Sequence, residues 1–381
     1  MHDLPIPTSP STCIASYADD LTVISQAPTP HGAAAHVQSY MGQLELWLAT
    51  NRMEVDPDKC FSTLVTPFNR EYAARPRVLL KGIPLPVEPT LHVLGVTLDR
   101  GMTFRPHVQS VSARARSRLG VLRAVTGTSF GNSKESVAAL YKQYVRPVME
   151  YACPVWTPGL AQTHHNTLQR TQNAALRIAT GSTRSTPVQH LHNECKVLPL
   201  RQHMDMRGAQ LLAKAENPSH ACHPLLTPRV TARAIRTTPA AYLKDCLESV
   251  PPCPRDISVA RHIHNTYASR AIEERGANTI LGFPPPQVDP SEEQLPRAER
   301  VNLCRLRCGH HAGLRSYRFR IGLEPDDLCL RCLGAPDTVV HVVEDCPALT
   351  PEREAAGVTS CLDLWDKPVE AAEFLRAAGL V

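Results

Sequence analysis

The spacing of apolar residues changes near Arg100, and this change divides the chain into two parts with different secondary structure. Before Arg100 the apolar residues form short runs bounded by turn-forming residues, a pattern typical of strands. After it they recur at helical intervals over long stretches, which indicates amphipathic helices. We therefore predict an α+β region at residues 1–100, followed by a helical domain at residues 101–216.

The first part is expected to form a small sheet with one helix packed on it. Thr29-Pro30 marks the predicted helix start, because proline is favoured at the first helical position. Apolar residues at helical spacing follow over residues 37–48. The predicted strands are residues 13–16, 21–24, 60–66, 78–80 and 93–98.

The second part contains four predicted helices. Three cover residues 106–125, 162–180 and 200–215, and another begins after a capping pair formed by Asn132 and Glu135. The first of these helices is rich in arginine and suits phosphate contacts. Its arginines are Arg114, Arg116, Arg118 and Arg123.

Prolines punctuate residues 217–296, at Pro251-Pro252 and Pro284-Pro285-Pro286. We therefore expect a linker there, with one helix near residues 260–275. A module that is first basic and then cysteine-bearing is expected at residues 297–350. Residues 351–381 are expected to form a helical tail.

Composition constrains the compartment and the partner. The formal charge of +5 permits a nucleic-acid partner without requiring one. The chain has 13 cysteines, an odd number, and no secretory signal at its N-terminus, so an intracellular location is expected, nuclear or cytoplasmic. No apolar run is long enough to span a bilayer, so no membrane association is expected. Oligomeric state leaves no signature in the sequence.

An acidic turn, Tyr17-Ala18-Asp19-Asp20, lies between two short apolar runs. Adjacent carboxylates at the tip of a hairpin suit divalent-metal binding, and polymerases use such groups to hold Mg²⁺ on a triphosphate. One turn is not a site, since two metals need a further carboxylate from a neighbouring strand. The alternative is an ordinary Asp-Asp turn in a surface hairpin.

Four metal-ligand residues fall in one short window: Cys329, Cys332, His341 and Cys346. Their spacing, C-x₂-C-x₈-H-x₄-C, predicts a closed tetrahedral Zn²⁺ site. Four protein ligands leave no open coordination position, so we assign no chemistry to the zinc and expect a knuckle that grips nucleic acid. The alternative is two buried cysteines with two incidental neighbours.

Basic and aromatic residues alternate just before this window. Arg315, Arg318 and Arg320 flank Tyr317 and Phe319, which suits phosphate contacts and base stacking. A basic helix with a solvated face would show the same pattern.

A second metal site is conceivable from Cys304, Cys308 and His310. The helical spacing of the two cysteines favours the alternative, an apolar helix face.

The acidic hairpin and its surroundings resemble a known family. Tyr17-Ala18-Asp19-Asp20 resembles the third catalytic motif of reverse transcriptases. Further segments are similar, in order and spacing, to the polymerases of non-LTR (LINE-type) retrotransposons, a class of transposable element, and a C-terminal CCHC arrangement is also found in that family. The segments are Asp3-Leu4-Pro5, residues 44–59, Leu94-Gly95-Val96-Thr97-Leu98-Asp99, Thr103-Phe104-Arg105-Pro106-His107 and residues 168–181.

This resemblance implies a fold and a chemistry. The fold would be α+β, with a partial reverse-transcriptase palm followed by a helical thumb bundle and a small zinc-knuckle module. Asp19 would bind Mg²⁺ directly with Asp20 as its companion, and Tyr17 would pack near the primer terminus. Lys59 would donate a proton near the triphosphate, unless it is a solvated lysine at a strand end. RNA and DNA would be the partners.

The chain also departs from the family pattern. The first catalytic aspartate and the glycine-rich nucleotide-binding segment of the family precede the hairpin, whereas only sixteen residues precede Tyr17 here. We therefore expect an RNA-directed DNA polymerase fragment that is inactive alone. The alternative is a non-catalytic nucleic-acid-binding protein that uses the arginine-rich helix and the zinc knuckle.

Overall fold

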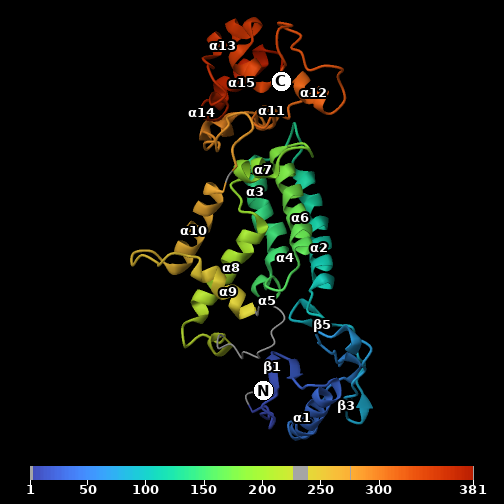
Figure 1. Ribbon diagram of the computed structural model, residues 1–381. Helices are drawn as coiled ribbons and strands as arrows, with labels where there is room; N and C mark the ends of the chain where they lie inside the picture. Colours follow the sequence, from blue (N-terminus) through green and yellow to red (C-terminus); the bar gives the residue numbers. More distant parts are fainter. Residues whose placement is uncertain (1–2, 226–238, 275, 381) are drawn as a thin grey trace. The chain divides into compact units, whose positions relative to one another are not determined.

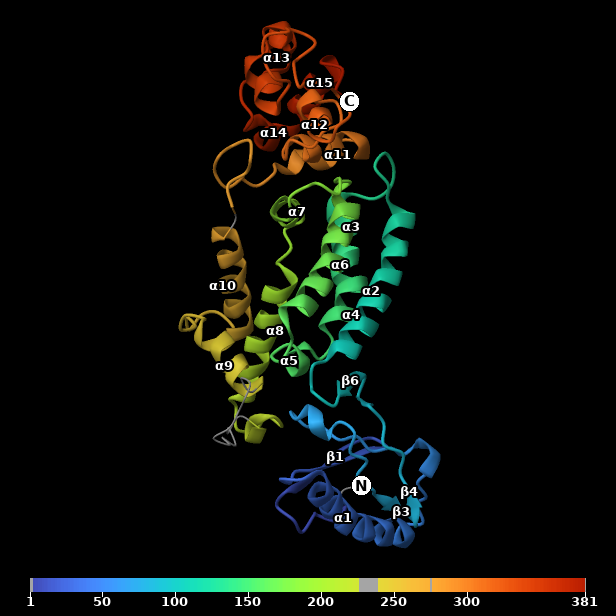
Figure 2. The ribbon, with the colours of Figure 1, turned by 45° about the vertical axis from the view of Figure 1, so that its right-hand side comes forward.

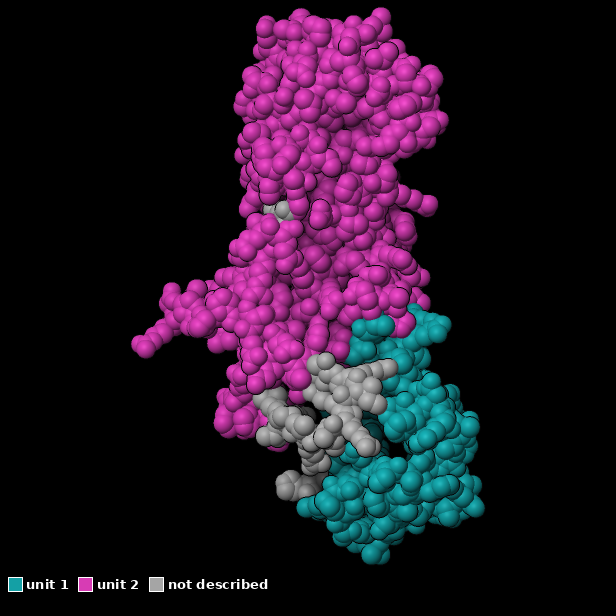
Figure 3. Space-filling model, in the orientation of Figure 1, with its two compact units in different colours: residues 1–110, 159–161 teal, residues 111–158, 162–381 magenta. Residues whose placement is uncertain are grey.

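The computed structural model describes residues 3–225, 239–274 and 276–380, which form helices and three short β-hairpins (Figures 1 and 2). No helix within these ranges is long and apolar enough to cross a membrane. The chain divides into two compact units, residues 1–110 with 159–161 and residues 111–158 with 162–381 (Figure 3). Residues 101–110 and 159–161, which were predicted to belong to the helical domain, lie in the first unit.

The first unit combines two-stranded antiparallel sheets with one long helix. The strand pairs are β1 (Thr12–Tyr17) with β2 (Asp20–Ser25), β3 (Leu79–Leu80) with β4 (Ile83–Pro84), and β5 (Thr90–Val93) with β6 (Val96–Asp99). Helix α1 (Pro30–Thr50) begins where predicted, because Thr29 Oγ1 accepts a hydrogen bond from Gly32 N at 3.1 Å. Its buried face packs on β2 and β3.

Two of the strands predicted in this unit differ from the structure. Residues 60–66 do not form a strand, and Ser62 makes an isolated parallel bridge with Val87. The predicted strand 93–98 is divided by a turn at Leu94-Gly95, where φ is 45° and 80°. Glycine adopts the left-handed conformation readily. Leu94 continues the apolar run, so the apolar pattern alone does not indicate a turn there. The 3₁₀ helices η1 (Pro57–Lys59) and η2 (Asn69–Glu71) lie between α1 and β3.

A helical bundle at residues 111–215 forms the first part of the second unit. Helices α2, α6 and α8 confirm the three predicted helices, and Leu122, Trp156 and Leu176 lie in the interior with 0% exposed surface. The elements are α2 (Arg105–Val125), α3 (Lys134–Leu140), the π-helical turn η3 (Tyr141–Val145), α4 (Arg146–Glu150), α5 (Cys153–Trp156), α6 (Gln162–Thr180), α7 (Val188–Cys195) and α8 (Leu200–Ala215).

The start of α3 lies one residue from the predicted cap. Ser133 is the N-cap, and its hydroxyl accepts a hydrogen bond from Ser136 N at 3.1 Å. Asn132 instead donates through Nδ2 to Val125 O at 3.3 Å. Serine and asparagine cap helices equally well, so two adjacent capping residues cannot be ranked from sequence. The pairing of Asn132 with Glu135 as a capping box is therefore wrong.

Two further helices pack on the bundle where a linker was predicted. Helices α9 (Pro239–Glu248) and α10 (Val259–Glu273) both contact α8. Met206 and Ala209 of α8 share an apolar cluster with Ile263 and Tyr267 of α10. The helices described within residues 217–296 therefore extend the bundle. A short 3₁₀ helix, η4 (His223–Leu225), precedes them.

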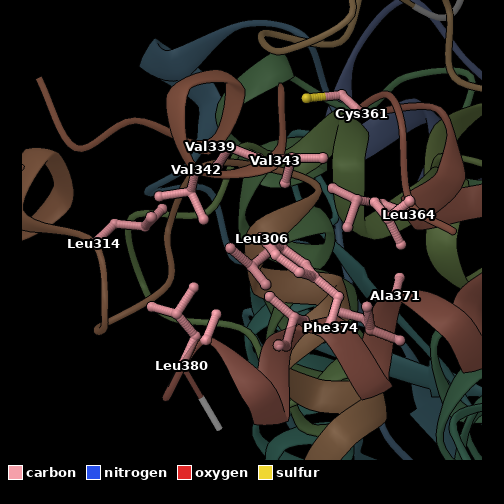
Figure 4. Packing of buried hydrophobic residues seen from close by; sticks show 14 of the residues in the cluster. Leu306, Leu314, Val339, Val342, Val343, Cys361, Leu364, Ala371, Phe374 and Leu380 are labelled. Atoms are coloured by element: carbon pink, nitrogen blue, oxygen red, sulfur yellow. The ribbon is translucent and has the colours of Figure 1, made fainter. Parts of the chain in front are cut away.

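Residues 290–380 form a C-terminal module with its own core (Figure 4). Val342, Leu364 and Phe374 are fully buried in this core, so the predicted helical tail is an integral part of the module. The elements are η5 (Pro290–Gln294), α11 (Arg297–Leu306), α12 (Arg315–Arg320), the π-helical turn η6 (His341–Asp345), η7 (Pro347–Leu349), α13 (Thr350–Ala356), α14 (Asp363–Asp366) and α15 (Pro368–Ala377).

Candidate metal centre and nucleic-acid surface

The four predicted zinc ligands lie together in the C-terminal module. Cys329 Sγ and Cys346 Sγ are 3.9 Å apart, and Cys332 Sγ is 3.2 Å from His341 Nε2. All four ligand atoms lie within 4.8 Å of one another. Ligands at about 2.3 Å (sulfur) and about 2.0 Å (nitrogen) from a tetrahedral Zn²⁺ are separated by roughly 3.6–3.8 Å, so the donor set fits this ion. The sulfur–sulfur distance is far above the roughly 2.05 Å of a disulfide.

Two backbone turns present these ligands. Gly334 N donates to Cys332 Sγ at 3.5 Å, and this hydrogen bond lowers the pKa of the Cys332 thiol, which favours the metal-binding thiolate. The other two ligands bracket the π-helical turn, in which Cys346 N donates to His341 O at 2.6 Å. Burial raises the pKa of the Cys346 thiol and so favours its protonated form. A bound cation would favour the thiolate instead.

A second buried group, His190, Glu194 and Cys304, also brings three ligand atoms within 4.8 Å. Cations of the protein itself already contact it. Lys134 Nζ lies 2.8 Å from Glu194 Oε2, and Arg307 Nη1 lies 3.4 Å from the same oxygen. Burial raises the pKa of the Cys304 thiol well above its usual range, so this sulfur stays protonated. The group is therefore an ion-pair network rather than a metal centre.

Cys304, Cys308 and His310 do not form a metal-binding group in the described part of the chain. Cys308 Sγ donates to Arg305 O at 3.2 Å, and His310 Nδ1 lies 2.6 Å from Cys308 O. Both cysteines are buried, which agrees with an apolar helix face.

The acidic turn lies at the tip of the β1–β2 hairpin. Tyr17 pairs with Asp20, so Ala18 and Asp19 form the turn, with Ala18 at a φ of 52°. Both aspartates are exposed, and Tyr17 is 67% exposed. Among the residues that the structure describes, neither aspartate belongs to a group of three or more side chains able to hold a metal ion. Two carboxylates supply part of a polymerase metal site, and a two-metal site needs more.

Lys59 lies in the first unit, at the end of the 3₁₀ helix η1 rather than at a strand end. Its Nζ is 3.6 Å from Asp56 Oδ2, and its side chain is 84% exposed. The lysine is therefore solvated, and its predicted contact with a triphosphate stays a prediction.

The arginines of α2 differ in their surroundings. Arg118 Nη1 donates to Tyr144 O at 2.6 Å, and the guanidinium lies 4.6 Å from the centre of the Tyr144 ring. Arg114, Arg116 and Arg123 are exposed and make no ion pair with a described residue. Three of the four guanidinium groups predicted to contact nucleic acid are thus available to an external anion.

The predicted arginines of α12 are more engaged. Arg315 Nη2 lies 2.9 Å from Asp326 Oδ1, and Arg318 Nη2 lies 2.7 Å from Glu324 Oε1. Arg320 donates through Nη2 to Gly309 O at 2.8 Å and remains exposed. Arg320 therefore has the guanidinium with the most free donors of the three, since a carbonyl uses one donor without neutralising its charge.

About half of this chain is similar in sequence to several curated proteins. The probable RNA-directed DNA polymerase from transposon X-element of Drosophila melanogaster is 27% identical over 200 residues, which cover 51% of this chain and 22% of that protein. The probable RNA-directed DNA polymerase from transposon BS of the same species is 28% identical over 185 residues, which cover 47% of this chain and 20% of that protein. The RNA-directed DNA polymerase of mobile element jockey from Drosophila funebris is 29% identical over 170 residues, which cover 44% of this chain and 18% of that protein.

About half of this chain is related to the reverse transcriptases of non-LTR retrotransposons. The match spans about a fifth of the length of those relatives. No protein-family model matches the chain, and no solved structure matches it at a significant level.

The sequence patterns missed how this reverse-transcriptase-related chain joins its bundle to its C-terminal module. Arg305 donates through Nε and Nη2 to Gly181 O, at 2.9 and 2.7 Å. Arg297 donates through Nη2 to Ile178 O at 3.1 Å. Both carbonyls lie at the C-terminal end of α6, where helix carbonyls lack partners and the helix dipole favours a cation. These arginines therefore hold the two parts together.

A buried ion cluster completes the junction, made of Lys134, Glu194, Glu292 and Arg307. Lys134 Nζ lies 2.8 Å from each of the two carboxylates, and Arg307 Nη1 lies 2.6 Å from Glu292 Oε1. The four residues come from α3, α7, η5 and the end of α11. Burial alone would lower the pKa of Lys134. The two carboxylates raise this pKa by more than burial lowers it, so the lysine stays charged. No short sequence motif could reveal this ion cluster, because Lys134 and Glu292 are 158 residues apart.

Proposed function

We propose that this chain is part of an RNA-directed DNA polymerase of a non-LTR retrotransposon, and that its 381 residues alone bind RNA and DNA without extending a primer. The observation that carries the proposal is the similarity of about half the chain to several polymerases of such elements. The first unit contributes palm elements, the bundle is the thumb, and the C-terminal module is the zinc knuckle.

The acidic hairpin supports the catalytic part of this proposal. Asp19 and Asp20 would hold Mg²⁺, which supplies charge for the triphosphate and the primer hydroxyl when bound. Tyr17 is exposed beside them, as a residue that packs near a primer terminus has to be. No third carboxylate joins the aspartates in a metal-holding group of the described residues, and this is why we expect no polymerisation from these residues alone.

The cysteine–histidine cluster supports a structural zinc ion. Cys329, Cys332, His341 and Cys346 would hold Zn²⁺, which would fix the two loops that carry them. Zinc of this kind contributes folding free energy and leaves no position for a substrate. We assign the zinc ion no reaction and expect it only to stabilise the segment next to the basic residues.

Nucleic-acid binding rests on the exposed arginines of α2. Arg114, Arg116 and Arg123 present planar guanidinium groups, which bind phosphate oxygens with two parallel hydrogen bonds. The same observation favours the second candidate function, a non-catalytic nucleic-acid-binding protein. In that case the aspartates of the hairpin would be a remnant of ancestry.

Primer extension and binding should be measured on the same preparation. With an annealed RNA template and DNA primer, Mg²⁺ or Mn²⁺ and all four deoxynucleotides, we expect no product but salt-dependent binding of the template–primer. The variant R114Q/R116Q/R123Q should lose about three charge contacts, which lowers affinity by about tenfold or more at low salt.

The outcomes separate the two parts of the proposal. Extension product that disappears in D19N/D20N would overturn the claim of inactivity and identify a complete polymerase. Binding that is unchanged in R114Q/R116Q/R123Q would remove the role of α2. Absence of any binding by the unmodified chain would reject both candidate functions.

A further inference from the structure

Two adjacent helices of the bundle carry positive charge and no carboxylate at all. The sequence of α2 contains five arginines and that of α6 contains two, and neither helix contains aspartate or glutamate. The helices lie side by side in both views, and Ser112 Oγ of α2 is 3.4 Å from Thr171 Oγ1 of α6 (Figures 1 and 2). Forty helical residues without one acidic side chain form an unusually one-sided charge distribution for an exposed surface.

Two arginines of α2 lie on one flank of that helix, and a third lies on the other. Arg116 and Arg123 follow Ser112 at intervals of four and eleven residues, so they share the face that adjoins α6. Arg118 lies on the other flank, against Tyr144. Arg170, on α6, is exposed and stands next to Thr171 in the sequence.

The loop between α6 and α7 carries this charge to the C-terminal module. Arg184 is exposed in that loop, and the neighbouring Ser185 Oγ lies 3.2 Å from the Tyr317 hydroxyl of α12. The guanidinium of Arg320 lies 5.3 Å from the centre of the same tyrosine ring. Arg177 holds the loop in place, since its Nε donates to Thr183 O at 3.2 Å.

Hydrogen bonds and buried ion pairs join the bundle to the C-terminal module at this end of α6. Arg305 and Arg297 bind the end of α6 through three hydrogen bonds to Gly181 O and Ile178 O, and the ion cluster is buried. Exposed guanidinium groups on neighbouring elements suit a partner with repeated negative charge. The 19 residues of α6 extend about 28 Å, which is long enough for several phosphates.

We propose that exposed arginines of the bundle and of the C-terminal module form one basic track, along which the phosphate backbone of a single nucleic-acid strand runs from α2 to α12. This inference rests on the proposed function and extends it to α6 and to the loop after it. The track consists of Arg116, Arg123, Arg170, Arg184 and Arg320.

The test compares two double variants of the full zinc-loaded chain. R170Q/R184Q removes two arginines of the track outside α2. R255Q/R261Q is the matched control, because both of its arginines are exposed and Arg261 lies on α10, on the side of the bundle away from α2 in both views (Figures 1 and 2). Affinity for a fluorescent 30-nucleotide single strand, as RNA and as DNA, is measured by anisotropy over a range of salt.

We expect R170Q/R184Q to weaken binding by about tenfold and to reduce the slope of log affinity against log salt by about 1.4, which is about 0.7 for each lost contact. R255Q/R261Q should keep the slope of the unmodified chain. Equal losses for RNA and DNA assign the track to the backbone, and loss with only one of them would overturn a backbone-only contact.

Other outcomes would overturn the track without touching the proposed function. R170Q/R184Q that behaves like R255Q/R261Q, while R114Q/R116Q/R123Q loses affinity, would confine binding to α2. Two strands bound per chain, measured by sedimentation, would show separate sites instead of one track. Displacement of the strand by polyglutamate at equal charge would point to an acidic protein partner. A chain that binds no strand at all would instead reject the proposed function itself.

Discussion

The two candidate metal sites of this chain are built in opposite ways. In the C-terminal module four ligand atoms lie within 4.8 Å of one another, and three of the four residues are buried. In the β1–β2 hairpin Asp19 and Asp20 are exposed, and no described side chain joins them in a metal-holding group. The difference shows that a closed site can be assembled from one short segment, whereas an open catalytic site depends on strands that meet only in the tertiary fold.

The largest effect should follow removal of the closed site. C329S/C332S should lower the zinc content from about one ion per chain to none. Because structural zinc contributes on the order of 10 kcal/mol in small domains, the C-terminal module should also unfold. Metal analysis and limited proteolysis measure the two effects, with C13S, at an exposed cysteine of the first unit, as the control. Undiminished zinc in C329S/C332S would show that the metal lies elsewhere.

A smaller effect should follow damage to the buried ion cluster. R307M leaves Lys134 as the one remaining cation of the cluster against two buried carboxylates, Glu194 and Glu292, which should cost about 3–5 kcal/mol of unfolding free energy. The control is R376M, whose ion pair with Glu299 is 53% exposed on the arginine side and should contribute about 0–1 kcal/mol. Urea unfolding measures both. Equal losses in the two variants would mean that the cluster does not stabilise the junction.

Acid should destabilise the second unit through a buried histidine. Burial lowers the pKa of His165 to about 4, aided by the charge of Arg201, while the unfolded value is about 6.5. The unfolded chain therefore binds the proton first, and stability is lost as the pH falls from about 6.5 to about 4. We expect a loss of about 1–2 kcal/mol that H165Q removes. Urea titrations at pH 7 and pH 4.5 test this, with H31Q, at an exposed site, as the control.

The smallest effect is expected at the open site. D19N/D20N should change the unfolding free energy by less than about 0.5 kcal/mol, because both side chains are exposed and lie in a turn that asparagine also favours. Nucleic-acid affinity should also be unchanged. If millimolar Mn²⁺ stabilised the unmodified chain but not D19N/D20N, the hairpin would hold a formed metal site, and the contrast between the closed and the open site would be wrong.

Local signals explain what could be predicted from the sequence. The bounds of α6 and α8 agree with the predicted helices, because their apolar residues recur without interruption. The four ligands of the cysteine–histidine cluster could be identified because they share one short window. The turn at Leu94-Gly95 was missed because it lies within an apolar run.

Features that depend on distant partners could not be predicted. Helices α9 and α10 extend the bundle by packing on α8, and nothing within their own sequences indicates that contact. Arg297 and Arg305 belong to the segment that was predicted only to be basic, and their partners are backbone carbonyls at the end of α6. A carbonyl leaves no trace in a residue pattern, so such a contact is visible only in the structure.

The π-helical turn η6 has a consequence for how this module can vary in evolution. His341 and Cys346 are five residues apart, a spacing that an α-helix would place about 140° apart around its axis. The hydrogen bond from Cys346 N to His341 O closes a wider turn and returns both side chains to one ion. Deletion of one residue between them would give an α-helical turn that keeps both ligands on one face. Homologues with C-x₂-C-x₈-H-x₃-C spacing should therefore bind zinc equally well, whereas a two-residue change should abolish binding.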